Sequence, residues 1–149
     1  MEGDPRRAAR LGEAFLDRLS ARGDRLPGCR TVLSRLAKRF RLGVVTNGID
    51  RVQRARLKAS RLDAFFDAVV TSEGCGFAKP DPRILHVALD ALGVAPRNAV
   101  YVGDDPEVDG GAAARAGVAF CWVDRGARRG RGPRPRRRIT HLLELEDLL

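Results

Sequence analysis

Three carboxylates, Asp104, Asp105 and Asp109, follow directly on a short apolar run at 99–102. That run predicts a buried strand, and Gly103 lets the backbone turn where the strand ends. Carboxylates crowded at the carboxyl end of a buried strand repel one another and lose hydration, so a hard divalent cation such as Mg²⁺ is the expected counter-ion. The alternative is a turn followed by a helix start, because Asp caps helices and proline suits the first helical position.

A second polar group, Thr46, Asn47 and Gly48, ends the β-branched run at 42–46. In a parallel α/β sheet the loops at the carboxyl ends of the strands carry the ligand site, and these three residues offer a hydroxyl, an amide and a backbone N–H to an anion. The alternative is a plain strand-to-helix turn, since Asn-Gly is a common turn dipeptide.

Lys79 is the third candidate for chemistry. It precedes Pro80, which bars helix at Lys79, so an extended backbone presents the side chain from a loop just before a new helix. An ammonium in that place would neutralise an anion. A lysine followed by Pro80, Asp81 and Pro82 is also typical of an ordinary surface.

The other residues with metal or redox chemistry show no such pattern. His86 and His141 have no metal-ligand spacing to any partner. Cys29, Cys75 and Cys121 are odd in number, far apart and without Cys-x-x-Cys spacing, so neither a disulfide framework nor a zinc site is expected.

Composition limits the class of protein. The 149 residues, 44% of them hydrophobic, are enough for one moderate core in one domain, with room for an appendage. No apolar run approaches membrane-spanning length and the amino-terminus lacks a secretory segment, so no membrane association and a cytoplasmic location are expected.

The net charge of +9 is concentrated in one segment. Eight arginines lie in residues 125–138 with no acidic residue among them, which leaves 20 basic residues against 19 acidic ones elsewhere. A run of this kind predicts a solvated loop, and nucleic acid is not an expected partner. The alternative is a site for phosphate or nucleic acid.

The elements that would hold the candidate residues alternate between helix and strand, which predicts an α/β fold with a parallel sheet. Apolar spacing and breakers predict helices at 5–21, 29–39, 50–60, 110–116 and 142–149, a further helix between Pro82 and Gly93, strands at 42–46, 68–71, 99–102 and 119–123, and irregular chain at 72–78.

In their order and spacing, Thr46-Asn47-Gly48, Lys79-Pro80 and Gly103-Asp104-Asp105 with Asp109 resemble the second, third and fourth motifs of the haloacid dehalogenase superfamily of phosphohydrolases. The wording Leu-Gly-Val-Val-Thr-Asn-Gly and Phe-Ala-Lys-Pro-Asp-Pro is most similar to the pyrimidine 5′-nucleotidase branch. Receiver domains of response regulators share the acid, hydroxyl and lysine set. Their acidic pair precedes the other two groups, however, and the order here argues against them.

The resemblance implies a Rossmann-like parallel sheet and a Mg²⁺-dependent phosphatase acting on a small phosphomonoester, with nucleoside 5′-monophosphates as the candidate substrate. It implies that Thr46 hydrogen-bonds a phosphoryl oxygen and that Asn47 and Gly48 line the same pocket. Lys79 would neutralise the phosphate and the nucleophile. Asp104 would bind Mg²⁺ with help from Asp105 or Asp109, and these three carboxylates would form the metal site.

One departure from the family pattern is severe. Family members begin with a strand ending in Asp-x-Asp, which supplies the nucleophile and the general acid/base, and residues 1–30 contain no such motif. Helix 5–21 resembles the last helix of a cap. The expectation is therefore a carboxyl-terminal part of a family member, with a cap remnant at 1–26 and an incomplete core at 27–149 that lacks its central strand and is inactive alone. The alternative is a non-catalytic remnant that binds phosphate, metal or nucleic acid.

Overall fold

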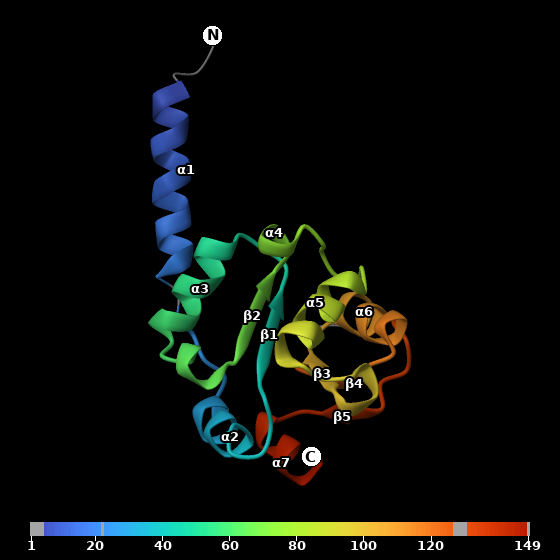
Figure 1. The fold of residues 1–149 in the computed structure, drawn as a ribbon. Helices are drawn as coiled ribbons and strands as arrows, with labels where there is room; N and C mark the ends of the chain where they lie inside the picture. Colours follow the sequence, from blue (N-terminus) through green and yellow to red (C-terminus); the bar gives the residue numbers. More distant parts are fainter. Residues whose placement is uncertain (1–4, 22, 127–130, 149) are drawn as a thin grey trace.

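The computed structural model describes residues 5–21, 23–126 and 131–148 and confirms the α/β class (Figure 1). Its helices are α1 (Pro5–Ser20), α2 (Cys29–Leu36), α3 (Asp50–Ala59), α4 (Ser72–Cys75), α5 (Arg83–Leu92), α6 (Val108–Ala116) and α7 (Leu145–Leu148). Its strands are β1 (Gly43–Thr46), β2 (Ala68–Thr71), β3 (Val100–Gly103), β4 (Ala119–Val123) and β5 (Arg137–Ile139). Short 3₁₀ turns lie at Asp63–Phe65, Pro96–Asn98 and Leu142–Glu144.

The strands form two parallel sheets. One pairs β1 with β2, with Thr46 opposite Thr71, and the other has the order β3-β4-β5, with Gly103 opposite Trp122. Within the described part of the chain, no ladder joins β1 to β3. Each of these two strands therefore has one edge without a strand partner, and an edge strand of this kind is open to pairing.

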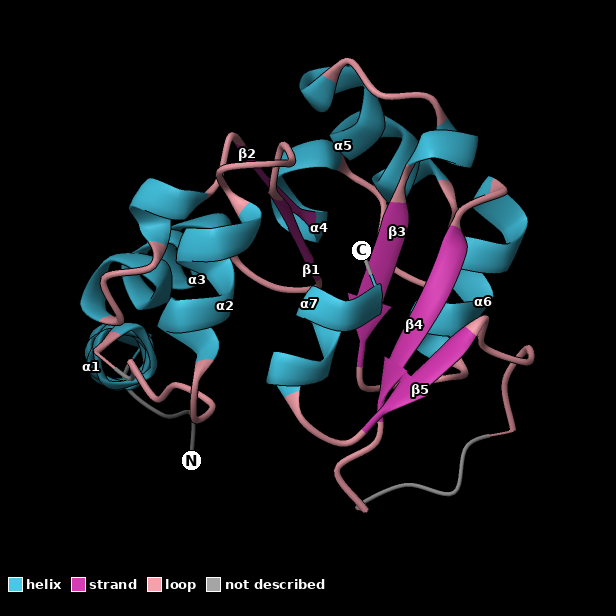
Figure 2. Cartoon of the chain, turned by 90° about the horizontal axis from the view of Figure 1, so that it is seen from below, coloured by secondary structure: helices cyan, strands magenta, loops and turns pink. Residues whose placement is uncertain are grey.

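Two apolar cores lie on opposite faces of the second sheet, because alternate residues of β4 point to opposite sides. Phe120 packs with Ile84 and Ala112 in a core with α5 and α6, and Cys121 packs with Ile139 in a core with α2 and α7. Figure 2 shows α6 and α7 beside the three strands of this sheet. These cores fix the strand ends that carry the candidate site.

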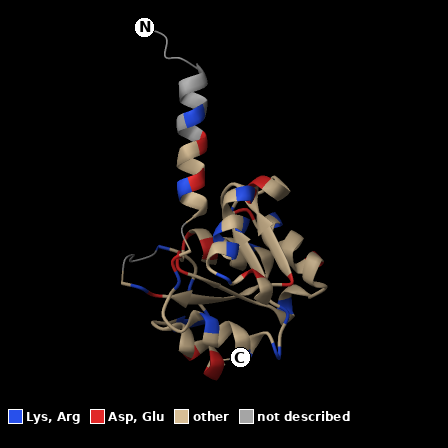
Figure 3. Ribbon diagram, turned by 90° about the vertical axis from the view of Figure 1, so that its left-hand side faces the viewer, with Lys and Arg blue, Asp and Glu red and all other residues tan. Residues whose placement is uncertain are grey.

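Helix α1 projects away from the other elements, and it carries both acidic and basic residues (Figures 1 and 3). It contacts α3. The apolar spacing that predicts this helix includes Phe15, yet Phe15 is 62% exposed in the structure. The division into a cap remnant at 1–26 and a core at 27–149 stays a prediction.

Two segments differ from the predicted elements. The segment predicted as irregular at 72–78 begins with the single helical turn α4, which Thr71 caps by accepting a hydrogen bond from the Gly74 amide. The arginine-rich segment, predicted as a loop, contains β5 at its end. Arg137 and Arg138 form a strand there because the backbone pairs with β4 and because Ile139, which follows them, is only 2% exposed. The arginines at 128 and 129 lie outside the described residues.

Candidate active site

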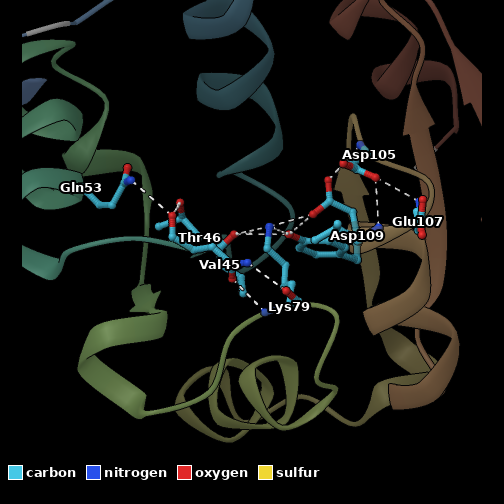
Figure 4. Close-up of polar contacts among 10 residues, drawn as sticks. Val45, Thr46, Gln53, Lys79, Asp105, Glu107 and Asp109 are labelled. Carbon is cyan, nitrogen blue, oxygen red and sulfur yellow. Dashed lines mark hydrogen bonds and ion pairs between the residues drawn. The ribbon is translucent and has the colours of Figure 1, made fainter. Parts of the chain in front are cut away.

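The Lys79 side chain is the centre of the candidate site. Its Nζ donates to Asp109 Oδ1 at 2.7 Å, to the Tyr101 hydroxyl at 2.8 Å and to the Val45 carbonyl at 3.3 Å. Figure 4 shows Val45, on the β1 side, and Asp109, on the α6 side, on either side of Lys79. The Lys79 and Asp109 side chains are only 11% and 7% exposed. The structure thus brings together the predicted lysine and one of the three predicted carboxylates.

Asn47 fixes the backbone of the Lys79 loop. Its Oδ1 accepts from the Lys79 amide at 2.8 Å and its Nδ2 donates to the Lys79 carbonyl at 2.9 Å. Both ends of the side-chain amide are therefore used to join the end of β1 to this loop. These two hydrogen bonds hold the backbone of Lys79 beside the end of β1.

Thr46 and Gly48 lie at the same strand end. The Thr46 hydroxyl makes one long hydrogen bond, at 3.4 Å, to the Asn47 carbonyl. The Gly48 amide, which the sequence offers to an anion, donates instead to Ser72 Oγ at 2.8 Å. Gly48 has φ 145°, where an L side chain is strained, and an added Cβ there would lie 2.6 Å from Gln53 Nε2. Thr46 is thus the residue of this group that retains a hydroxyl available for a ligand.

The three acidic residues after β3 have different surroundings. Asp104 is exposed, and within the described residues its carboxylate makes no hydrogen bond or ion pair. Its backbone carbonyl accepts from Trp122 Nε1 at 3.3 Å, which fixes the loop to β4. Asp105 Oδ1 accepts from the amides of Glu107 and Val108, each at 3.0 Å, at the start of α6. Asp105 therefore performs the helix-start role that the sequence offers as an alternative.

Asp109 is the buried member of the acidic set. Besides Lys79, its Oδ1 accepts from the Tyr101 hydroxyl at 3.3 Å, and its Oδ2 accepts from the Asp105 amide at 3.1 Å. Gly103 makes room for it, because a Cβ at Gly103 would overlap the Asp109 carboxylate. Burial, followed by the charge and the hydrogen bond of Asp109, raises the pKa of Tyr101 well above its ordinary value.

Sequence reasoning missed Tyr101 and the Val45 carbonyl. The signal for Tyr101 was present, since it precedes Gly103 by two positions in a strand and alternate residues share a face. The signal for the Val45 carbonyl was absent, because any residue type supplies a backbone oxygen.

In the described ranges, no three His, Cys, Asp or Glu side chains are grouped so that they could hold a metal ion by themselves. Among Asp104, Asp105 and Asp109, the carboxylates of Asp105 and Asp109 accept hydrogen bonds from protein groups, and Asp104 is the exposed member of the set. The same ranges contain no helix with the length and apolar content that a membrane span requires.

A profile of the haloacid dehalogenase-like hydrolase family matches residues 11–123. The phosphoserine phosphatase of Thermus thermophilus is 42% identical over 127 residues, which cover 85% of this chain and 51% of that protein. The pyrimidine 5′-nucleotidase YjjG of Escherichia coli is 35% identical over 142 residues, covering 94% of this chain and 63% of the nucleotidase. The chain thus spans between half and two thirds of the length of these relatives.

Solved structures agree with this family relationship. A HAD phosphatase from Thermococcus onnurineus superposes with a TM-score of 0.78 at 33% identity, over 83% of this chain and 57% of that one. The HAD-hydrolase YfnB of Bacillus subtilis, described as bound to magnesium, gives a TM-score of 0.86 at 27% identity, over 100% of this chain and 65% of that one. Sequence, fold and relatives therefore show that this chain belongs to the haloacid dehalogenase-like hydrolase family.

Proposed function

We propose that this chain forms the phosphate- and metal-binding part of a Mg²⁺-dependent phosphomonoester hydrolase. The observation that carries the proposal is the buried Lys79 ammonium, held between the ends of β1 and β3 beside Asp109. A fixed cation at the carboxyl ends of parallel strands stabilises the charge of a transferring phosphoryl group. Thr46 would donate its hydroxyl to a phosphoryl oxygen on the β1 side of the same site.

Asp104 suits the role of a Mg²⁺ ligand better than its two neighbours do. Its carboxylate is exposed and has no partner among the described residues, whereas Lys79 and Tyr101 occupy Oδ1 of Asp109. Mg²⁺ prefers six oxygen ligands, commonly one or two carboxylates with phosphate oxygens and water. Asp105 or Asp109 would assist through water, and bound Mg²⁺ would supply charge neutralisation to the phosphate.

The nucleophile in this proposal is an aspartate on a strand between β1 and β3. In favour of it, β1 and β3 are not joined by a ladder in the described chain, and each has an edge open to pairing. An aspartate carboxylate there would attack phosphorus, the ester oxygen would leave, and water would hydrolyse the resulting aspartyl-phosphate. Because residues 1–30 contain no Asp-x-Asp, we propose that residues 1–149 alone are inactive.

The substrate we propose is a small phosphomonoester. Relatives are named for activity on phosphoserine, pyrimidine nucleotides and N-acylneuraminate 9-phosphate, all of which carry one phosphate on a small organic group. The resemblance of the motifs to the nucleotidase branch makes nucleoside 5′-monophosphates the first class to test.

The proposal is tested with the chain extended upstream by a family strand that carries Asp-x-Asp. We expect Mg²⁺-dependent release of phosphate from p-nitrophenyl phosphate and from at least one small monoester. Lys79→Ala and Asp104→Asn should each lower kcat on the order of 10²–10³-fold, the size typical for loss of one charge-stabilising group. Lys58→Ala, which removes an exposed lysine of α3, is the matched control and should retain full activity.

A second function, phosphate or metal binding without catalysis, is favoured by the pairing of Asp109 with Lys79, because this carboxylate is thereby not free to attack phosphorus. An extended chain that binds phosphate and Mg²⁺ yet releases no phosphate from any monoester would establish this alternative.

A further inference from the structure

Tyr101 is a half-buried titratable group that the proposed reaction does not use. It is the only tyrosine of the chain and lies in the middle of β3. Its ring stacks on Phe120 with centroids 6.4 Å apart, so the core holds the ring while the hydroxyl extends toward β1.

The hydroxyl of Tyr101 completes the hydrogen bonding of Lys79. An ammonium has three N–H donors. Those of Lys79 have three acceptors, namely Asp109 Oδ1 at 2.7 Å, Tyr101 Oη at 2.8 Å and the Val45 carbonyl at 3.3 Å. The Tyr101 hydroxyl oxygen lies 3.3 Å from both the Val45 carbonyl oxygen and Asp109 Oδ1, so the hydroxyl can donate its proton to either. The ring itself adds a cation–π contact, with Nζ 5.4 Å from its centroid.

We propose that Tyr101 is a positioning residue that holds the Lys79 ammonium in place for a phosphate. That the ligand is phosphate rests on the proposed function. When phosphate binds, Lys79 exchanges its longest hydrogen bond, to the Val45 carbonyl, for a phosphoryl oxygen. It keeps the two shorter bonds, to Asp109 and to Tyr101, so the ammonium turns only one N–H toward the ligand.

The neutrality of the hydroxyl explains why a tyrosine suits this position. Lys79 and Asp109 already form a pair without net charge. A second carboxylate on the ammonium would make the group negative and repel phosphate, whereas a tyrosine hydroxyl accepts the hydrogen bond without adding charge. A rigid ring also restricts a long, flexible lysine more effectively than another flexible side chain would.

The chain offers a direct readout because it has only three lysines. Lys38 and Lys58 are exposed, so in protein labelled with ¹³C,¹⁵N-lysine their side-chain signals serve as references for Lys79. A held lysine gives two distinct Hε resonances, and a freely rotating one gives a single averaged resonance. We expect separate Hε resonances for Lys79 in the native chain and their convergence in Tyr101→Phe.

Phe120→Leu is the matched control, because it disturbs the packing of the Tyr101 ring but leaves the hydroxyl. We expect this variant to unfold more easily than the native chain while it keeps the separate Lys79 resonances. Unchanged Lys79 resonances in Tyr101→Phe, or the same convergence in both folded variants, would overturn the positioning role.

Titration with inorganic phosphate separates this role from the proposed function. We expect phosphate to shift the Lys79 signals of the native chain and to bind Tyr101→Phe about tenfold more weakly, the factor for one hydrogen bond. Lys79 signals that differ between the two proteins but never respond to phosphate would support positioning and count against the proposed function. Equal phosphate affinity in the two proteins would contradict positioning and leave the proposed function intact.

Discussion

The Lys79 ammonium and the Asp109 carboxylate lie 2.7 Å apart, and neither side chain is more than 11% exposed. One comes from the loop before α5 and the other from the first turn of α6. The pair therefore joins the loop before α5 to the start of α6, and its burial makes it sensitive to the loss of either partner.

We predict that Lys79→Met destabilises the fold by about 3 kcal/mol, because it leaves the Asp109 charge buried without a cation. Urea unfolding followed by circular dichroism measures the change. Arg83→Met is the matched control, since it breaks the exposed Arg83–Asp81 pair and should leave the unfolding midpoint unchanged. Equal midpoints for native chain and Lys79→Met would show that the buried pair contributes nothing to stability.

Gly103→Ala should displace the Asp109 carboxylate, because the new Cβ would occupy its position. The expected result is a lower unfolding midpoint together with loss of the separate Lys79 resonances. Gly111→Ala, in the helix that carries Asp109, is the control. A Cβ there meets only ordinary contacts, 3.5 Å from Pro80 Cβ, so this variant should be neutral or more stable by up to about 1 kcal/mol. A Gly103→Ala protein with native stability and native Lys79 signals would contradict the packing described.

Tyr101 should resist ionisation at high pH. Burial first, and then Asp109, raise its pKa in the folded chain above the value of about 10 expected for the unfolded chain. Above that pH the unfolded chain loses a proton that the folded chain keeps, so stability should fall as pH rises beyond about 10. Because this is the only tyrosine, absorbance at 295 nm reports it alone. Ionisation with an ordinary midpoint in folded protein would show that the hydroxyl is not buried as described.

Much of the fold was predictable from the sequence, since β2 and β4 lie at the predicted residues and β1 and β3 differ by one position. β-branched and apolar runs bounded by glycine and polar residues carry that information locally. β5 was not predictable, because Arg137 and Arg138 have no strand pattern and only the ladder to β4 makes them a strand.

The candidate site was predictable in part, because residue types and their order along the chain are local information. The residue types and order indicated Thr46, Lys79 and Asp104, whose roles remain proposals. The partners of these residues depend on contacts between distant segments. Asn47, for example, hydrogen-bonds both backbone groups of Lys79, which lies 32 positions away. These bonds arise only in the folded chain, so no local sequence pattern predicts them.

Mg²⁺ should bind this chain weakly, and through Asp104. The described residues contain no group of three metal-binding side chains, so few protein ligands are available. Calorimetric titration should show weak Mg²⁺ binding by the native chain and none by Asp104→Asn. Tight binding that persists in Asp104→Asn would contradict the assignment of this residue as the metal ligand.

We propose that residues 1–149 supply the phosphate-binding lysine and the metal ligand but not the nucleophile. The most direct measurement is a p-nitrophenyl phosphate assay of purified residues 1–149 with Mg²⁺, beside the version extended by an Asp-x-Asp strand. We expect no turnover by residues 1–149 and Mg²⁺-dependent turnover by the extended chain. Mg²⁺-dependent turnover by residues 1–149 that is lost in Lys79→Ala would contradict it, because the attacking group would then lie within this chain.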